Sequence, residues 1–208
     1  MKVYLVCLLT SLVIIPTAGK SQSFNLQQML NEKKLIYDKN HVPVPLQEKQ
    51  GISGNTVVWL KDVGFSTGTI EVDLRGKDVP QRSFIGIAFH GIDTITYDAI
   101  YFRPFNFQSS DPVRKIHAVQ YISHPDFTWE RLRNEKNGVY EKGITPPPSP
   151  TAWFHAKIVV DDSSITVFVN GATVPSLTVN KLNGRKDGLI GLWNYGLNGD
   201  FANLTLKK

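Results

Sequence analysis

The sequence predicts an all-β protein, an antiparallel sandwich of two sheets, and three observations support this prediction. Ten short segments rich in β-branched and aromatic residues follow one another, each bounded by Gly, Pro, Asn or Asp. No helical pattern of crossover length separates them, so neighbouring strands can be joined by turns and pair antiparallel. No repeat of fixed period is present, which argues against a propeller or a solenoid.

The elements follow from the local pattern. One short helix is expected at 24–34, where Leu26, Met29 and Leu30 fall on one side. The ten predicted strands cover residues 56–60, 69–75, 84–90, 97–105, 117–124, 152–161, 165–170, 177–179, 189–194 and 201–206. No segment after residue 35 has a convincing helical period. Segment 135–150 ends in ITPPPSP, whose prolines cannot join a central strand, so we expect a long loop that lies across the sandwich.

The first 23 residues read as a secretory signal peptide. Met1 and Lys2 precede the apolar run 3–15, and small or polar residues follow Pro16, with cleavage expected after Gly19, Ser21 or Ser23. The run is too short to span a bilayer, and a short membrane anchor is the alternative. The expected protein is therefore exported, to a periplasm or the exterior, with a single domain at 24–208.

Composition excludes several kinds of chemistry. Cys7 is the only cysteine and lies in the signal segment, so the mature chain would lack Cys-ligated zinc and thiol nucleophiles. The net charge of +5 is scattered, which favours solubility over nucleic-acid binding. No phosphate-binding glycine loop, dinucleotide fingerprint or Ser-His-Asp arrangement is present.

Metal binding has little support in the sequence. His117 and His124 lie seven residues apart on one predicted strand and hence on opposite faces, and His90 and His124 form no ligand motif. No metal site and no catalytic cofactor are predicted. A structural calcium ion held by Asp187 or Asp200 is left open.

The segment 97–133 carries the clearest functional signal. Aromatic rings, a guanidinium, amides and imidazoles alternate with strand-forming apolar residues, and these groups stack on and hydrogen-bond to sugars. Placing the aliphatic residues inward leaves small and polar residues on the other face of the sheet, which describes a groove. The predicted ligand-binding residues are His90, Tyr101, Arg103, Asn106, Gln120, Trp129 and Arg131. The alternative for Arg103 is a buried ion pair with Asp98 or Glu141.

Glu141 and His124 are the catalytic candidates. Glu141 lies in the connection expected to fold over the groove and is the carboxylate nominated as general acid or base, with Asp93 and Asp98 as alternatives. The paired carboxylates of a retaining glucanase are not found, because Glu71-Val72-Asp73 is followed by no second glutamate on that strand.

The C-terminal third, WFHAKIVVDDSSITVFVNG at 153–171 and DGLIGLWNYGLNGDFANL at 187–204, resembles the closing half of concanavalin A-like lectin/glucanase jelly rolls of the laminin-G type. Segment 64–76 matches their N-terminal strand. Segment 84–90 also resembles the Asn-Ser-Gly-Ile-x-Phe-Arg strand of the 3-keto-disaccharide hydrolase-like domain, with His90 at the position of the Arg. The family's late Leu-Gln-x-His-Gly strand is Leu192-Trp193-Asn194-Tyr195-Gly196 here.

These resemblances imply a concanavalin A-like jelly roll and a carbohydrate ligand, and the fold alone does not determine an activity. We expect an exported carbohydrate-active protein that binds a saccharide or a modified keto-glycoside on one sheet face. The sequence leaves open whether the protein also cleaves this ligand, as a glycoside hydrolase or lyase. The alternative is a non-catalytic carbohydrate-binding or laminin-G-like adhesion module.

Overall fold

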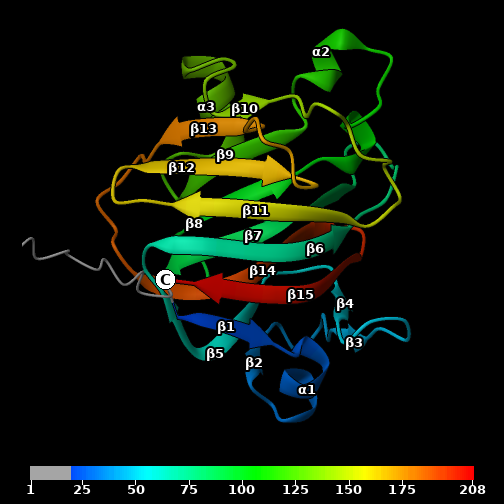
Figure 1. Cartoon of the computed structure of the whole chain (residues 1–208), viewed down its shortest axis with the longest axis vertical. Helices are drawn as coiled ribbons and strands as arrows, with labels where there is room; N and C mark the ends of the chain where they lie inside the picture. The colour runs from blue at the N-terminus through cyan, green and yellow to red at the C-terminus, as the bar shows by residue number, and fades with distance from the viewer. Residues whose placement is uncertain (1–19) are drawn as a thin grey trace, which may run out of the picture.

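A computed structural model describes residues 20–208 and shows two antiparallel sheets packed face to face (Figure 1). The first sheet, sheet A, contains β13 (Leu177–Asn180), β12 (Ser164–Val169), β11 (Phe154–Val160), β6 (Gly68–Arg75), β15 (Gly199–Lys207), β4 (Ile52–Gly54) and β3 (Val44–Pro45) in that order, and β1 (Ser21–Phe24) pairs with β15. The second, sheet B, runs β10 (Glu141–Lys142), β9 (Val119–His124), β8 (Tyr97–Phe102), β7 (Ser83–Gly91), β14 (Gly188–Gly196), β5 (Val58–Phe65) and β2 (Leu35–Ile36). The predicted all-β sandwich is confirmed, and each of the ten predicted strands is present.

The core lies between the two sheets and follows from the alternation of the strands. On β6, Ile70, Val72 and Leu74 are fully buried while the residues between them are partly exposed. On β7, Ile85 and Ile87 point into the same core. Each such aliphatic side chain contributes about 1.5–3 kcal/mol on burial, so this period-2 pattern fixes which face of each sheet is left for function.

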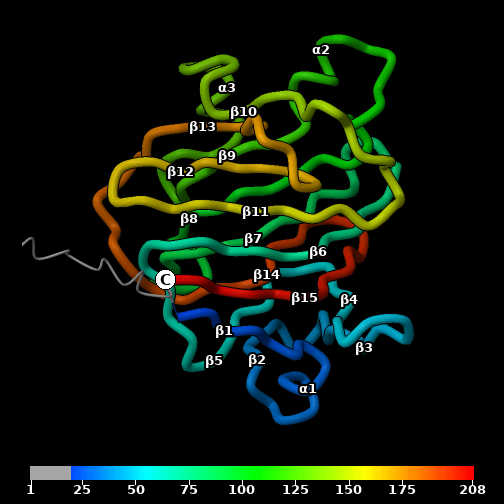
Figure 2. The backbone as a smooth tube through the Cα atoms, in the orientation of Figure 1, coloured from blue at the N-terminus to red at the C-terminus, as the bar shows by residue number. Residues whose placement is uncertain are grey.

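The structure has an N-terminal strand that the sequence did not predict. Residues Ser21–Phe24 form β1 and pair with the end of β15, with Ser21 opposite Lys207, so the first blue segment of Figure 2 runs beside the last red one. The folded domain therefore includes residues that the sequence placed in the signal segment. Residues 1–19 of the predicted signal peptide lie outside the described residues.

Short helices account for the main differences from the prediction. The predicted helix 24–34 is α1 (Leu26–Asn31), capped by Asn25. After residue 35, where no helix was expected, the chain forms η1 (Pro104–Asn106), α2 (Pro112–Lys115) and α3 (Trp129–Glu135). Strand 97–105 accordingly ends at Phe102, and strand 117–124 begins at Val119. These helices have two turns or fewer, which is too short to produce a hydrophobic period, and α3 is marked only by its N-cap Thr128.

The loop predicted at 135–150 also contributes to a sheet. Glu141 and Lys142 form β10, which pairs with β9 at the edge of sheet B. This pairing places Glu141 opposite Gln120, which brings the connection against the sheet. Within residues 20–208, no helix is long and apolar enough to cross a membrane.

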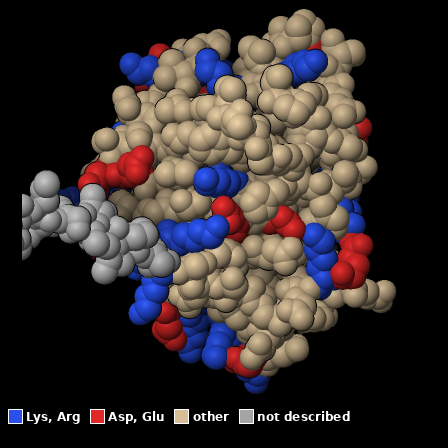
Figure 3. All heavy atoms as spheres, viewed as in Figure 1, with Lys and Arg blue, Asp and Glu red and all other residues tan. Residues whose placement is uncertain are grey.

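The outer face of sheet A carries balanced charge. Lys207 lies 2.8 Å from Glu71, Lys49 lies 2.9 Å from Asp73, and Arg75 lies 2.8 Å from Asp200. Blue and red side chains accordingly lie side by side across the middle of the face in Figure 3. The Lys207–Glu71 pair is the most exposed of the three, and exposed pairs contribute little to stability. Together the three pairs leave no strong field of one sign on this face.

Candidate functional site

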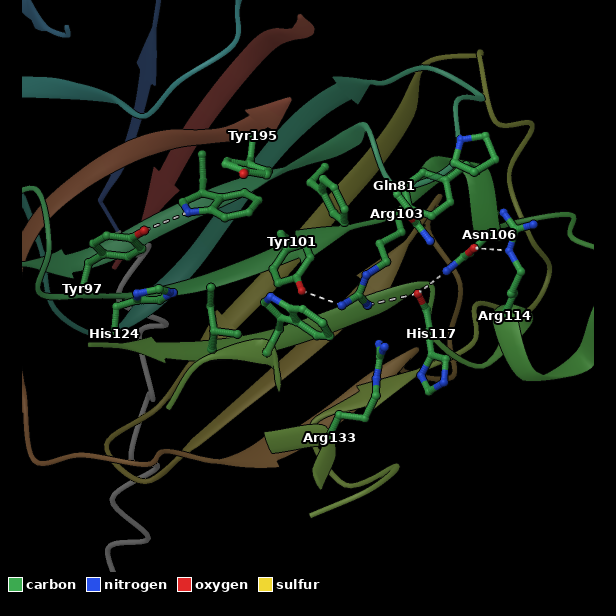
Figure 4. Close-up of a pocket in the computed structure, with 16 residues that line it drawn as sticks. Gln81, Tyr97, Tyr101, Arg103, Asn106, Arg114, His117, His124, Arg133 and Tyr195 are labelled. Carbon is green, nitrogen blue, oxygen red and sulfur yellow. Dashed lines mark hydrogen bonds between the residues drawn. The ribbon is translucent and has the colours of Figure 1, made fainter. Parts of the chain in front are cut away.

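A pocket of about 890 Å³ opens on the face of sheet B that points away from sheet A. Strands β7, β8, β9 and β14 form its floor, and the segments around η1, α2 and α3 form its sides (Figure 4). The lining residues are Pro80, Gln81, Phe84, Tyr97, Tyr101, Arg103, Phe105, Asn106, Arg114, His117, Ile122, His124, Trp129, Arg133, Trp193 and Tyr195. Its size and mainly apolar lining with a few polar groups are typical of a small-molecule site.

Aromatic rings from three strands form the floor of the pocket. The Tyr101 and Trp193 rings lie 4.7 Å apart, and Trp193 Nε1 donates a hydrogen bond of 3.2 Å to the Tyr97 hydroxyl. Phe84 lies beside Tyr101 and Tyr195, with ring centroids 6.1 and 5.9 Å away. Tyr195 is 66% exposed although it belongs to the sheet. Exposed ring faces fixed by a sheet are rigid platforms for a flat apolar ligand face.

Arg103 holds the polar end of the floor together. It is 5% exposed, and its Nη2 donates to the Tyr101 hydroxyl at 2.6 Å and also to Gln120 Oε1. Its Nη1 donates to the His117 carbonyl oxygen at 3.1 Å and to Glu141 at 3.4 Å. Arg103 thus combines the two predictions made for it, since it lines the pocket and is also a buried ion-pair partner.

Glu141 lies behind the pocket wall and is 2% exposed. Arg133 donates to both its oxygens, at 2.8 and 2.7 Å, and His117 Nδ1 lies 2.9 Å away without hydrogen-bond alignment. Burial alone would raise the pKa of Glu141, but the hydrogen bonds from Arg133 and the charge of Arg103 outweigh it, so the pKa is lowered. The predicted general acid or base is therefore an ion-paired carboxylate that holds the cations of the wall in place.

Two histidines line opposite ends of the pocket (Figure 4). The His124 ring stacks on Tyr97 at 5.1 Å, and burial lowers the pKa of His124. Burial also lowers the pKa of His117, against the opposing effect of Glu141. His117 precedes β9, so the prediction that one strand would carry both histidines to opposite faces was wrong. The lowered pKa of each ring favours its neutral form, in which one ring nitrogen can accept a proton.

His90 is the clearest correction to the predicted site. It is fully buried outside the pocket, where its Nδ1 lies 3.1 Å from Asp98 Oδ2 and its Nε2 lies 2.6 Å from the Ser66 carbonyl oxygen. The ring stacks on Phe65 at 6.1 Å. A φ of 51° at His90 and a register shift between β7 and β14, at the step from Ala88 to Gly91, interrupt the alternation that should have turned this side chain outward.

The other predicted residues divide between the lining and its support. Asn106 and Trp129 line the pocket, and Trp129 is 47% exposed. Gln120 is fully buried behind Tyr101 and Arg103, so it positions them without lining the cavity. Arg131 lies on the outer side of α3, where it pairs with Glu135 at 2.9 Å, and does not reach the pocket.

The alternative carboxylates also lie outside the lining. Asp98 is buried and binds Tyr121 at 2.9 Å, Arg185 at 2.9 Å and Asn183 at 2.6 Å. Asp93 closes an exposed turn by accepting hydrogen bonds from the backbone of residues 95 and 96. Both act in local structure, not in the pocket.

No part of the chain between residues 20 and 208 gathers three or more His, Cys, Asp or Glu side chains for a metal ion. Asp200 is engaged by Arg75 at 2.8 Å, whereas Asp187 is exposed. The calcium site stays a prediction.

Sequence reasoning missed Trp193, Tyr195, Phe84 and Arg114. A signal for the first two existed, because Ile190 and Leu192 are core residues and alternation then places Trp193 and Tyr195 on the pocket face. They also occupy the Gln and His positions of the strand that resembles the keto-disaccharide hydrolase-like domain. Arg114 reaches the pocket from α2, which no pattern predicted.

Comparison with known proteins decides the family. The sequence profile of the 3-keto-alpha-glucoside-1,2-lyase-like domain matches residues 31–207. The chain belongs to this family. The pocket is thus a feature of a 3-keto-alpha-glucoside-1,2-lyase-like domain, and the resemblance seen in segment 84–90 is confirmed. Among curated protein sequences, none matches the chain.

Solved structures share the fold at low sequence identity. Carbohydrate-binding module CBM66 from Bacillus subtilis has 15% identity and a TM-score of 0.58, covering 80% of this chain and 92% of its own. A Bacillus subtilis protein of unknown function with a galectin-like fold has 12% identity and a TM-score of 0.61, with coverages of 92% and 97%. An endo-β-galactosidase from Clostridium perfringens that releases GlcNAcα1-4Gal has 8% identity and a TM-score of 0.58, with coverages of 96% and 65%. These likenesses establish the jelly-roll fold of the lectin type.

Proposed function

We propose that this protein is exported and binds a saccharide in the pocket on sheet B. The observation that carries the proposal is the combination of rigid aromatic faces with hydrogen-bond donors around one cavity. Trp193 and Tyr195 offer ring faces to the C–H surface of a sugar, while Arg103, Asn106 and His117 stand at the polar end to meet its hydroxyl groups. Family membership and the carbohydrate-binding neighbours support the same ligand class.

The second candidate function is cleavage by elimination. Among the described residues that line the pocket there is no Asp or Glu, so the pair of carboxylates that most glycosidases use is missing there. The family description points instead to a 3-keto-glycoside, whose C2 hydrogen lies next to the carbonyl and is acidified by it. A base removes this proton, the C1–O bond breaks, and the leaving oxygen takes up a proton, giving an enone and a free alcohol. Neutral His124 is the base we propose, since it stands at the aromatic end of the pocket.

A glycan array followed by calorimetry tests saccharide binding. Tyr195→Ala removes an exposed ring from the pocket and should weaken binding about tenfold or more, if the ring contributes on the scale of the roughly 1–3 kcal/mol known for bases stacked on aromatic side chains. Phe168→Ala on the outer face of sheet A is the matched control and should bind normally. If both variants bind equally well, the ligand does not bind in this pocket.

Product analysis separates binding from cleavage. A p-nitrophenyl 3-keto-α-glucoside should release nitrophenol together with the enone if elimination takes place, whereas hydrolysis would give nitrophenol and the 3-keto sugar; the parent glucoside should stay intact. His124→Ala should abolish release and retain ligand binding. If the array finds ligands but neither substrate is cleaved, the protein acts as a carbohydrate-binding module.

The adhesion alternative predicts a different result, in which pocket variants bind their partner normally and surface-loop variants do not.

Export is tested by the mature N-terminus. We expect it at Lys20, after cleavage following Gly19, because cleavage after Ser23 would remove three of the four residues of β1. N-terminal sequencing of the secreted protein checks this.

A further inference from the structure

Positive charge exceeds negative charge at one end of the pocket. Arg103, Arg114 and Arg133 all line the cavity at the end where His117 stands (Figure 4). Glu141 is the carboxylate bound to two of them, and it lies behind the wall. Three guanidiniums against one carboxylate leave two positive charges in excess, and burial lowers the pKa of His117, which favours the neutral form of this ring.

Arg114 contributes one of these two excess charges. Its Nε donates to Asn106 Oδ1 at 3.3 Å, and its guanidinium stands 6.0 Å from the Phe105 ring centre. Within residues 20–208 it forms no ion pair. The neighbouring carboxylate of Asp111 instead caps α2, accepting hydrogen bonds from the backbone N–H groups of Val113 and Arg114. Asn106 in turn donates to the His117 carbonyl oxygen at 3.0 Å, so the amide orients the guanidinium and is itself fixed.

The three guanidiniums are each held beside an aromatic ring. Arg133 stands 5.2 Å over the Trp129 ring, and Arg103 stands 4.8 Å over Tyr101. In a concave site with apolar walls the field of these charges is screened less than on an open surface, so it concentrates on whatever enters. Planar guanidinium groups are also the side chains best suited to bind carboxylate, sulfate or phosphate oxygens.

A neutral sugar would leave this charge uncompensated, whereas a negatively charged substituent would neutralise it. The outer face of sheet A shows that the chain balances its exposed charges elsewhere, with Lys207 beside Glu71 and Lys49 beside Asp73. The chain as a whole also carries a net positive charge, and the pocket end differs in that three guanidiniums converge on one cavity that no carboxylate of residues 20–208 lines.

We propose that the ligand is an acidic saccharide whose carboxylate or sulfate group binds between Arg114, Arg103 and Arg133. This rests on the proposed saccharide function and specifies its substrate class. The sugar ring then lies toward the aromatic floor at Trp193, and the anionic substituent points to the end marked by Asn106 and His117. Carboxylate and sulfate groups are both candidates because the oxygens of each can accept hydrogen bonds from guanidinium N–H groups.

The test is an array that pairs neutral glycans with uronate-bearing and sulfated glycans of the same linkage, followed by calorimetry of each pair that contains a binder. We expect the acidic member to bind at least tenfold tighter, as follows from one added charge-assisted contact. This preference should shrink as salt is raised from 50 to 500 mM, because the interaction between charges is screened. The uronate and sulfate arms show which group is preferred.

Two variants assign the preference to the pocket. Arg114→Gln should remove the tenfold preference, measured as the ratio of the affinities for the acidic and the neutral member of each pair. Arg131→Gln is the matched control, since this arginine lies on α3 outside the pocket and pairs with Glu135. It should behave as the wild-type protein. Thermal denaturation of both variants shows whether the fold is retained.

Each outcome decides a different proposal. Neutral glycans bound as tightly as acidic ones would overturn the acidic ligand and leave the saccharide function standing. A preference that survives Arg114→Gln would also overturn it, and so would inorganic sulfate that competes as well as the sulfated glycan. If no glycan on the array binds the protein, the saccharide function itself is overturned.

Discussion

Glu141→Gln tests how much one buried carboxylate stabilises the polar wall of the pocket. The amide keeps the volume of the side chain and removes its charge, so Arg103 and Arg133 lose their counter-ion while Arg103 stays buried. Removing one partner of a buried pair costs on the order of 3–5 kcal/mol. Because the Arg133 side chain is 30% exposed and can turn to solvent, we expect the lower end, about 3 kcal/mol.

For a domain of this size, a loss of that amount corresponds to a fall in Tm of roughly 6–12 °C. Thermal and urea denaturation at pH 7 measure it. The lowered pKa of Glu141 adds a pH dependence with a defined sign. A carboxylate whose pKa is depressed in the folded state stabilises it fully above its ordinary pKa of 4.5, and this contribution is lost as the pH falls through the folded pKa.

The stability difference between wild type and Glu141→Gln should therefore be largest near neutral pH and shrink below about pH 4.5. A variant that matches the wild-type Tm at pH 7 would refute the reasoning, because the carboxylate would then contribute nothing to the wall. A difference that grows on acidification would refute the assigned direction of the pKa shift.

Three further predictions follow from the same region. Arg103→Ala should lower the free energy of unfolding by about 3 kcal/mol and also weaken ligand binding, since Tyr101 and Gln120 lose their partner; unchanged denaturation would contradict this. Gly86→Ala should cost on the order of 1–3 kcal/mol or more, because the added Cβ would lie 2.6 Å from the Tyr101 Cα, and faster hydrogen exchange in β8 would report it. His124→Phe should reduce the loss of stability between pH 7 and 5 in urea denaturation, because the buried wild-type imidazole, whose pKa is below 6.5, resists protonation.

Alternation along the strands was sufficient to predict much of the sandwich and part of the pocket floor. The pattern that buries Ile100 and Phe102 necessarily turns Tyr101 to the other face, and the same pattern places Gln120 beside it on β9. Such predictions hold wherever a strand keeps its register, since they need only the period of two.

Alternation fails where the register changes. His90 lies within β7, yet its positive φ at the register shift between β7 and β14 turns the ring into the interior, and the alternation of the preceding residues does not predict this shift. The contacts of Glu141 with Arg133 and Arg103 were equally hidden, because they depend on β10 pairing with β9 and on a helix of seven residues. The positions and contacts of these residues depend on how the chain packs in the tertiary structure more than on local propensity.

The position of the last two strands has a consequence for how the chain reaches this structure. β14 lies between β7 and β5 within sheet B, and β15 lies between β6 and β4 within sheet A. Phe201 pairs with Leu74, so these contacts join residues far apart along the chain. Topologies dominated by such distant pairings fold slowly, in milliseconds to seconds. Until residues 188–207 are available, neither sheet is continuous, and Trp193 and Tyr195 are missing from the pocket floor. Assembly of the binding surface and completion of the fold are therefore the same late event.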